Sequence, residues 1–259
     1  MAEIGWFQLL TAALGGGVTV KALDIFYQEF RQRSERTRSA QRFVDEHLDP
    51  LLKAGDELVG KLRSLAENDF KELRDLNPET EKLQSTEFGG LLFLFARFWA
   101  RVEIFRRQGL SVAIGEDDRG KRLQNFLDCL ESRRVRIVDR IAQRAVGEVM
   151  VERQPGTLDT TSFVDFVKSY ETNVEMRRWV RPLVMVLART HHTHERQQLL
   201  QYGVVVHALI DTLDPKHFVT RNRPSYANKL TRRSWRDLRY RVFGRLTLPR
   251  FDVHHFTRP

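Results

Sequence analysis

Apolar residues recur every three to four positions over most of this chain, in segments that proline and glycine separate. From Leu51 to Leu73 they form a stripe with a period near 3.6 residues, and charged side chains occupy the other positions. This pattern is typical of an amphipathic helix that buries one face. No segment shows the apolar–polar alternation of a half-buried strand. The sequence therefore predicts an all-α fold, a helical bundle.

Further helices are expected where the same period returns between turn signals. Breaks are expected at Asn77-Pro78, Gln154-Pro155-Gly156 and Asp214-Pro215. Pro182 should kink or restart the helix that contains it, because proline lacks an N–H donor and clashes with the preceding turn. The predicted helices cover residues 86–108, 118–152, 163–187 and 195–213.

Composition excludes several other classes of protein. The chain has 259 residues, of which 41% are hydrophobic and 30% are charged, so it is neither wholly disordered nor a polytopic membrane protein. Its single cysteine, Cys129, excludes a disulfide framework and a cysteine-based zinc or iron–sulfur site. Cys129 lies beside Leu130 in the predicted apolar stripe, which favours a small core residue over a nucleophile.

Positive charge is concentrated at the C-terminus. Residues 216–259 contain twelve Lys and Arg against Asp237 and Asp252, a net charge of +10, whereas the first 215 residues carry −1. A near-neutral body with a basic tail is typical of proteins whose tail meets a polyanion.

The tail also has an amphipathic pattern. As a helix it would place Trp235, Leu238, Val242 and Leu246 on one face. Three interpretations stay open: an anionic lipid surface, nucleic acid, or docking on the chain's own carboxylates, such as those of residues 116–118. The predicted anionic-surface-binding residues are Arg232, Arg233, Trp235, Arg236, Arg239, Arg241 and Arg245.

The N-terminus resembles a membrane anchor. Residues 4–20 carry no charge, and basic residues follow from Lys21 onward. The positive-inside rule then predicts a single-pass inner-membrane protein with its N-terminus outside and its body in the cytoplasm. Ala12 with Gly16, and Ala13 with Gly17, have the small-residue spacing that lets helices pack closely. Two interpretations stay open: self-association into a homo-oligomer, and small residues that only fill space or add flexibility.

Four segments follow from these patterns. They are an N-terminal anchor helix over residues 1–30, a basic juxtamembrane helix or linker over 31–50, a cytosolic helical bundle over 51–215 and the basic, aromatic-rich tail over 216–259.

Several segments resemble a widespread group of bacterial proteins of uncharacterised activity. The resemblance covers about residues 1–220 and is carried by the anchor with its basic flank and by four helix-packing motifs. The motifs are Asp49-Pro50-Leu51-Leu52, residues 93–104, residues 144–150 and residues 208–215. The resemblance implies an N-terminal anchor and a helical body, and it implies no activity.

A histidine-rich segment is the best candidate for catalysis. On a continuous helix His191, His194 and Glu195 share a face, and imidazole with carboxylate can bind zinc or a similar metal. The order differs from His-Glu-x-x-His, and the alternative is a polar helix start capped by Thr193. Neither Gly15-Gly16-Gly17 nor Gly89-Gly90 has the lysine and hydroxyl residue of a phosphate loop, so no cofactor is expected.

These observations favour a non-catalytic, membrane-tethered scaffold or adaptor whose basic tail contacts an anionic surface. The first alternative is a nucleic-acid-binding protein. The second alternative is a metal-dependent enzyme that uses His191, His194 and Glu195.

Overall fold

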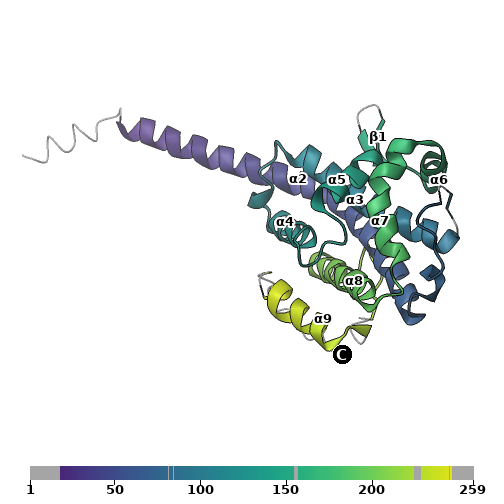
Figure 1. Cartoon of the computed structure of the whole chain (residues 1–259). Helices are drawn as coiled ribbons and strands as arrows, with labels where there is room; N and C mark the ends of the chain where they lie inside the picture. The colour runs from purple at the N-terminus through teal and green to yellow at the C-terminus, as the bar shows by residue number, and fades with distance from the viewer. Residues whose placement is uncertain are drawn as a thin grey trace, which may run out of the picture.

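The C-terminal part of helix α2 (Val18–Glu67) belongs to the core, and its N-terminal part projects from the body of the protein (Figure 1). The computed structural model describes residues 18–80, 82–83, 85–154, 157–224, 229–244 and 246. From Ala40 onward one face of α2 is buried, whereas Phe26 and Phe30 are 70% and 76% exposed on the part that leaves the body. Pro50 lies inside α2 without interrupting it.

Helices α3 (Thr86–Gly109) and α8 (Thr193–Leu213) pack against α2 and form the centre of the bundle. Both have long apolar segments, and α8 is buried almost continuously from Leu199 to Ile210. The Trp99 indole donates a hydrogen bond of 2.8 Å to the Tyr202 hydroxyl, which links α3 to α8 inside the core. This bond satisfies two polar groups that would be costly to bury alone.

Shorter helices surround this centre. α4 (Asp118–Leu130) packs on α8, α5 (Arg140–Val149) packs on α3, and α7 (Val174–Ala188) packs on α5. Side chains before several helices satisfy free N–H groups at their first turns, as expected of helix caps. The caps are Ser85 before α3, Asp117 before α4, Asp139 before α5, Ser162 before α6 (Phe163–Thr172), Asn173 before α7 and Thr231 before α9 (Arg232–Arg236).

Gly147 explains how closely α5 approaches α3. A Cβ atom at this position would lie 2.7 Å from the Trp99 carbonyl oxygen and 2.9 Å from the Glu103 side chain. Because real Cβ atoms do not come that near to a backbone oxygen, only glycine allows this helix spacing.

The predicted all-α fold is confirmed at the level of its helices, and two local predictions are wrong. The helix expected over 118–152 is two helices, α4 and α5, because Asp139 starts a new helix by accepting from the Ile141 N–H. Residues 151–160 form a small antiparallel hairpin of β1 (Val151–Gln154) and β2 (Thr157–Thr160). Of the kink or restart expected at Pro182, the restart does not occur there, because Pro182 lies within α7, which begins after its cap residue Asn173.

The predicted inner-membrane localisation is also wrong. Within the described ranges, no helix combines the length and the apolar character that crossing a bilayer requires. α2 is long enough, but its N-terminal part is not apolar enough, because it already contains four charged residues: Lys21, Asp24, Glu29 and Arg31. This finding contradicts a single-pass protein with its N-terminus outside. Residues 1–17, which include most of the predicted anchor and the small-residue pairs, lie outside the described residues.

Candidate anion-binding surface

The basic tail folds back onto the body (Figure 1). Helix α9 continues into a π-helix over Asp237–Phe243, and both lie beside α8. Leu238 and Val242 are 1% and 4% exposed, and Phe243 and Leu246 are also buried in the core. The predicted apolar face therefore exists, and it faces the protein.

Hydrogen bonds hold the tail at several points. The Gln197 side chain donates to the Lys229 carbonyl at 3.0 Å and accepts from the Thr231 N–H at 2.7 Å. The Gln201 amide donates to the Ser234 carbonyl at 3.3 Å. These side chains from α8 satisfy main-chain groups of the tail, so the tail is an integral part of the fold.

Two basic residues that precede α9, Arg223 and Lys229, are used for docking. The Arg223 guanidinium forms two hydrogen bonds with the Asp56 carboxylate of α2, at 2.7 and 3.1 Å. This contact raises the pKa of Arg223 above its ordinary value, although burial acts in the opposite direction. Lys229 pairs with Asp69 at 3.7 Å.

The next arginines are directed outward. Arg232, Arg233 and Arg236 are exposed, and none forms an ion pair or a hydrogen bond with another residue that the structure describes. Such a row of like charges repels itself unless an anion neutralises it. These three residues are the strongest candidates for contact with a polyanion.

The other predicted tail residues have partners or fall outside the described part. Arg239 lies over the rings of Trp235 and Tyr240, with its guanidinium carbon 5.1 and 5.3 Å from the ring centroids. Arg241 is exposed and pairs with Asp237 at 3.1 Å. Arg245 lies outside the described residues.

Arg241 also lines a groove on this side of the tail. It has a volume of about 500 Å³ and lies between the tail and the loop that joins α4 to α5. Of the described residues that line it, three are arginines and one, Asp128, is acidic. The lining residues are Asn125, Asp128, Cys129, Ser132, Arg133, Arg134, Arg241, Val242 and Leu246.

Sequence reasoning missed Arg133 and Arg134 as surface candidates. Both are exposed, and the Arg134 guanidinium donates to the Arg241 carbonyl at 3.0 Å. The sequence did contain an indication of a loop here, because Arg134 occupies a position of the predicted 118–152 helix where the apolar stripe requires an apolar residue. The loop between α4 and α5 explains why the stripe is interrupted at this position.

The Cys129 thiol in this groove is not an activated nucleophile. Burial, together with the negative charge of Asp128, raises its pKa to about 12. The thiol is therefore protonated at neutral pH, and the reactive thiolate is scarce.

The histidine segment lies at the turn between α7 and α8. The rings of His191 and His192 are 3.9 Å apart, and His191 Nδ1 lies 3.2 Å from the Ala188 carbonyl. Within the described part of the chain, no group of three His, Cys, Asp or Glu side chains is arranged to hold a metal ion, and this includes His191, His194 and Glu195.

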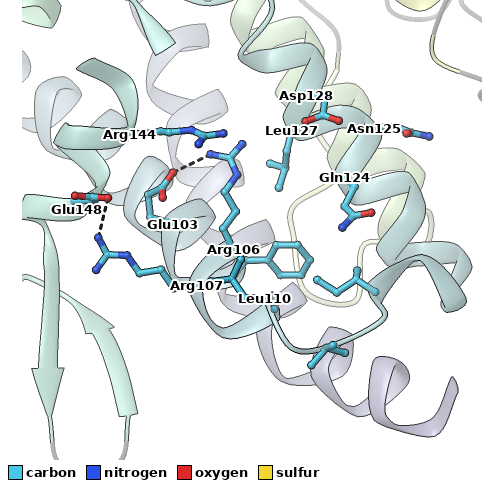
Figure 2. Close-up of a pocket in the computed structure, with 14 residues that line it drawn as sticks. Glu103, Arg106, Arg107, Leu110, Gln124, Asn125, Leu127, Asp128, Arg144 and Glu148 are labelled. Atoms are coloured by element: carbon cyan, nitrogen blue, oxygen red, sulfur yellow. Dashed lines mark hydrogen bonds and ion pairs between the residues drawn. The ribbon is translucent and has the colours of Figure 1, made fainter. Parts of the chain in front are cut away.

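A second recess, of about 720 Å³, is lined by residues of α3, α4 and α5 (Figure 2). Its basic residues pair with carboxylates of the same helix or of a neighbouring helix. Arg106 pairs with Glu103 at 2.8 Å, and Arg107 pairs with Glu148 at 2.9 Å. These ion pairs occupy the basic residues of the recess, in contrast to those of α9.

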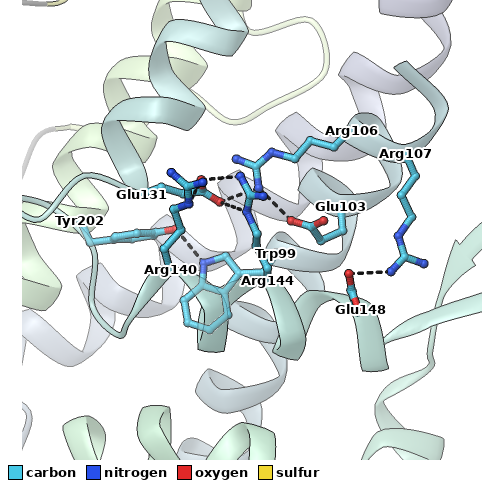
Figure 3. Close-up of polar contacts among 9 residues, drawn as sticks. All are labelled: Trp99, Glu103, Arg106, Arg107, Glu131, Arg140, Arg144, Glu148 and Tyr202. Atoms are coloured by element: carbon cyan, nitrogen blue, oxygen red, sulfur yellow. Dashed lines mark hydrogen bonds and ion pairs between the residues drawn. The ribbon is translucent and has the colours of Figure 1, made fainter. Parts of the chain in front are cut away.

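Glu131 organises the ion pairs behind this recess (Figure 3). Its carboxylate is 2.5 Å from Arg106 and 3.0 Å from Arg144, and Arg140 lies 3.7 Å away. Burial alone would raise the pKa of Glu131, but the hydrogen bond from Arg144 and the charge of Arg106 outweigh it and lower the pKa below its ordinary value. The network joins α3, the α4–α5 loop and α5, which makes it structural.

Comparisons with family models, curated proteins and solved structures find no significant match to this chain. The resemblance to the bacterial group therefore stays a prediction.

Proposed function

We propose that this protein is a non-catalytic adaptor that binds a nucleic-acid strand through its basic C-terminal surface. The observation that carries the proposal is the division of the tail into a buried apolar face and an exposed row of three arginines that form no ion pair with another described residue. Phosphates that bind such arginines release condensed counterions, which supplies most of the affinity of many nucleic-acid complexes.

An anionic lipid surface fits this arrangement less well. An amphipathic helix binds a bilayer by inserting its apolar face. In this tail Leu238 and Val242 are packed into the body, so insertion would require the tail to undock. The groove arginines also surround a concavity, which a strand can enter and a flat surface cannot.

Docking of the tail on its own carboxylates accounts for only part of the charge. Arg223 and Lys229 do pair with Asp56 and Asp69. The predicted carboxylates behave differently, because Asp117 caps α4 and lies 3.5 Å from Arg119. Among the described residues, none of Glu116, Asp117 and Asp118 pairs with an arginine of the tail.

The proposal is tested by fluorescence anisotropy of a labelled oligonucleotide of about 20 nucleotides with the full chain. The wild type should bind with an affinity that falls steeply as salt rises. The variant R232Q/R233Q/R236Q should bind at least about tenfold more weakly, and its salt slope should be shallower by about 2, since each single-strand phosphate contact contributes about 0.7.

A matched control removes the same charge elsewhere. Arg36, Arg38 and Arg42 are exposed on α2, so R36Q/R38Q/R42Q should retain binding and slope. An equal loss in both variants would show that only net charge matters and would contradict the proposal. Binding to vesicles with about 30% anionic lipid but to no oligonucleotide would assign the surface to lipid instead.

A further inference from the structure

The groove between the tail and the α4–α5 loop is small, and its lining includes both buried apolar side chains and exposed arginines. Its volume of about 500 Å³ is within the range of sites that hold small molecules and single nucleotides. Among its lining residues Val242 and Leu246 are only 4% and 8% exposed, and we refer to them as its apolar floor. Arg133, Arg134 and Arg241 are exposed, and we refer to them as its rim.

This division matches the two chemical parts of a nucleotide. A base is flat and largely apolar on its faces, so it suits the floor, whereas the phosphates suit the arginine rim. Asn125 and Ser132 add hydrogen-bonding groups for the edge of a base. The carboxylate of Asp128 repels phosphate, which favours the arginine side for the backbone.

An exposed aromatic residue directly precedes one of the groove residues in the chain. Tyr240 precedes Arg241 and is 64% exposed. Its ring is held by the Arg239 guanidinium and by an edge contact with Trp235, whose centroid is 6.5 Å away. An exposed ring that is fixed in this way is a platform on which a neighbouring base can stack.

The exposed arginines continue from this platform along the tail. From Arg232 to Arg241 the α-helical rise of about 1.5 Å per residue gives at most about 14 Å, and the π-helix from Asp237 on shortens this, so the segment reaches only a few nucleotides of an extended strand. π-Helices are rare in proteins, and those that occur are often found at functional sites. In this tail Tyr240 and Arg241 of the π-helix are exposed, whereas Leu238 and Val242 are buried.

We infer that the basic surface selects single-stranded over double-stranded nucleic acid, with one unstacked base in the groove and an adjacent base on Tyr240. In a duplex the bases are stacked and paired, so their faces can reach neither the apolar floor nor the tyrosine ring. This inference rests on the proposed function and names its substrate class, an unpaired DNA or RNA strand.

The test compares a labelled single strand, as DNA and as RNA, with a duplex of the same sequence at one salt concentration. The full chain should bind the single strands at least about tenfold more tightly than the duplex. Y240L should lose about fivefold or more of single-strand affinity, the lower end of the effect of one stacked base, with an unchanged salt slope. Y240F keeps the ring and should bind as the wild type does.

A second variant tests the groove itself. Asn125 lines both the groove and the second recess, so N125W should reduce the volume of the groove and weaken single-strand binding. Gln124 lines the second recess but not the groove, so Q124W is the control for effects that arise in the recess, and it should leave binding unchanged.

Two different failures can be distinguished. Equal affinity for duplex and single strand, or wild-type binding by Y240L and N125W, would overturn this inference. If R232Q/R233Q/R236Q still loses binding in that case, the proposed function remains. If no nucleic acid binds the wild type, both the inference and the proposed function fail.

Discussion

The guanidinium of Arg134 donates a hydrogen bond of 3.0 Å to the main-chain carbonyl of Arg241, 107 positions further along the chain. This bond joins the α4–α5 loop to the π-helix of the tail and closes one side of the groove. Two arginines would ordinarily repel each other, but the carbonyl is an acceptor and Arg241 is balanced by Asp237. The contact therefore brings positive charges close together without placing one guanidinium against the other.

We expect Arg134→Gln to loosen the tail locally. The loss of one hydrogen bond of this kind costs about 1 kcal/mol, because water replaces the partner only in part. Hydrogen exchange of main-chain amides over 238–243 should become faster, while exchange in α3 and α8 stays as in the wild type. Arg133→Gln is the control, since Arg133 forms no hydrogen bond with another described residue, and unchanged exchange in both variants would contradict the prediction.

The helices could be predicted because their apolar periodicity is local. The stripe from Leu51 to Leu73 and the capping serine before α3 need only neighbouring residues to be recognised. The apolar face of the tail, with Leu238 and Val242, was predicted on the same basis. Periodicity does not say what covers a face, so the sequence left an anionic lipid surface, nucleic acid and docking on the chain's own body open as partners of the tail.

The groove could not be predicted because it depends on a long-range contact. Arg133 and Arg134 were placed within a continuous helix, and nothing local indicated that a loop there would meet residues 241–246. The hairpin was missed for a related reason. Each strand has only four residues, too few to show alternation, and it is defined by its pairing of Val151 with Thr160.

Docking of the tail should contribute measurably to global stability. Leu238 is 1% exposed, and its replacement by alanine removes buried apolar atoms and leaves a cavity. We expect Leu238→Ala to lower the free energy of unfolding by about 2–4 kcal/mol in urea denaturation. Tyr240→Ala, at a 64% exposed position two residues away, should change it by less than about 0.5 kcal/mol. Similar values for both would mean that the tail is not part of the cooperative unit.

The Cys129 thiol should resist alkylation in the folded protein. Burial and the charge of Asp128 raise its pKa to about 12, so the thiolate that attacks iodoacetamide is rare at pH 7. In denaturant the same thiol should react at the rate of a free cysteine, whose pKa is about 8.5. Mass spectrometry before and after unfolding measures the difference, and rapid labelling of the native chain would contradict the buried environment.

Glu131 should make stability dependent on acid pH. Its pKa is lower in the folded protein than in the unfolded chain because Arg144 and Arg106 stabilise the carboxylate more than burial disfavours it. A group with a lowered folded pKa stabilises the fold above its unfolded pKa, near 4.3 for glutamate, and loses this contribution as pH falls through the folded pKa. We expect Glu131→Gln to lower the free energy of unfolding by about 2 kcal/mol at pH 7, with the difference from wild type shrinking below about pH 4.

The control is Glu148→Gln, because Glu148 is 52% exposed in its pair with Arg107 and should contribute less than about 1 kcal/mol. Urea denaturation at both pH values measures these differences, and a Glu131→Gln effect that persists undiminished in acid would show that shape, not charge, accounts for it.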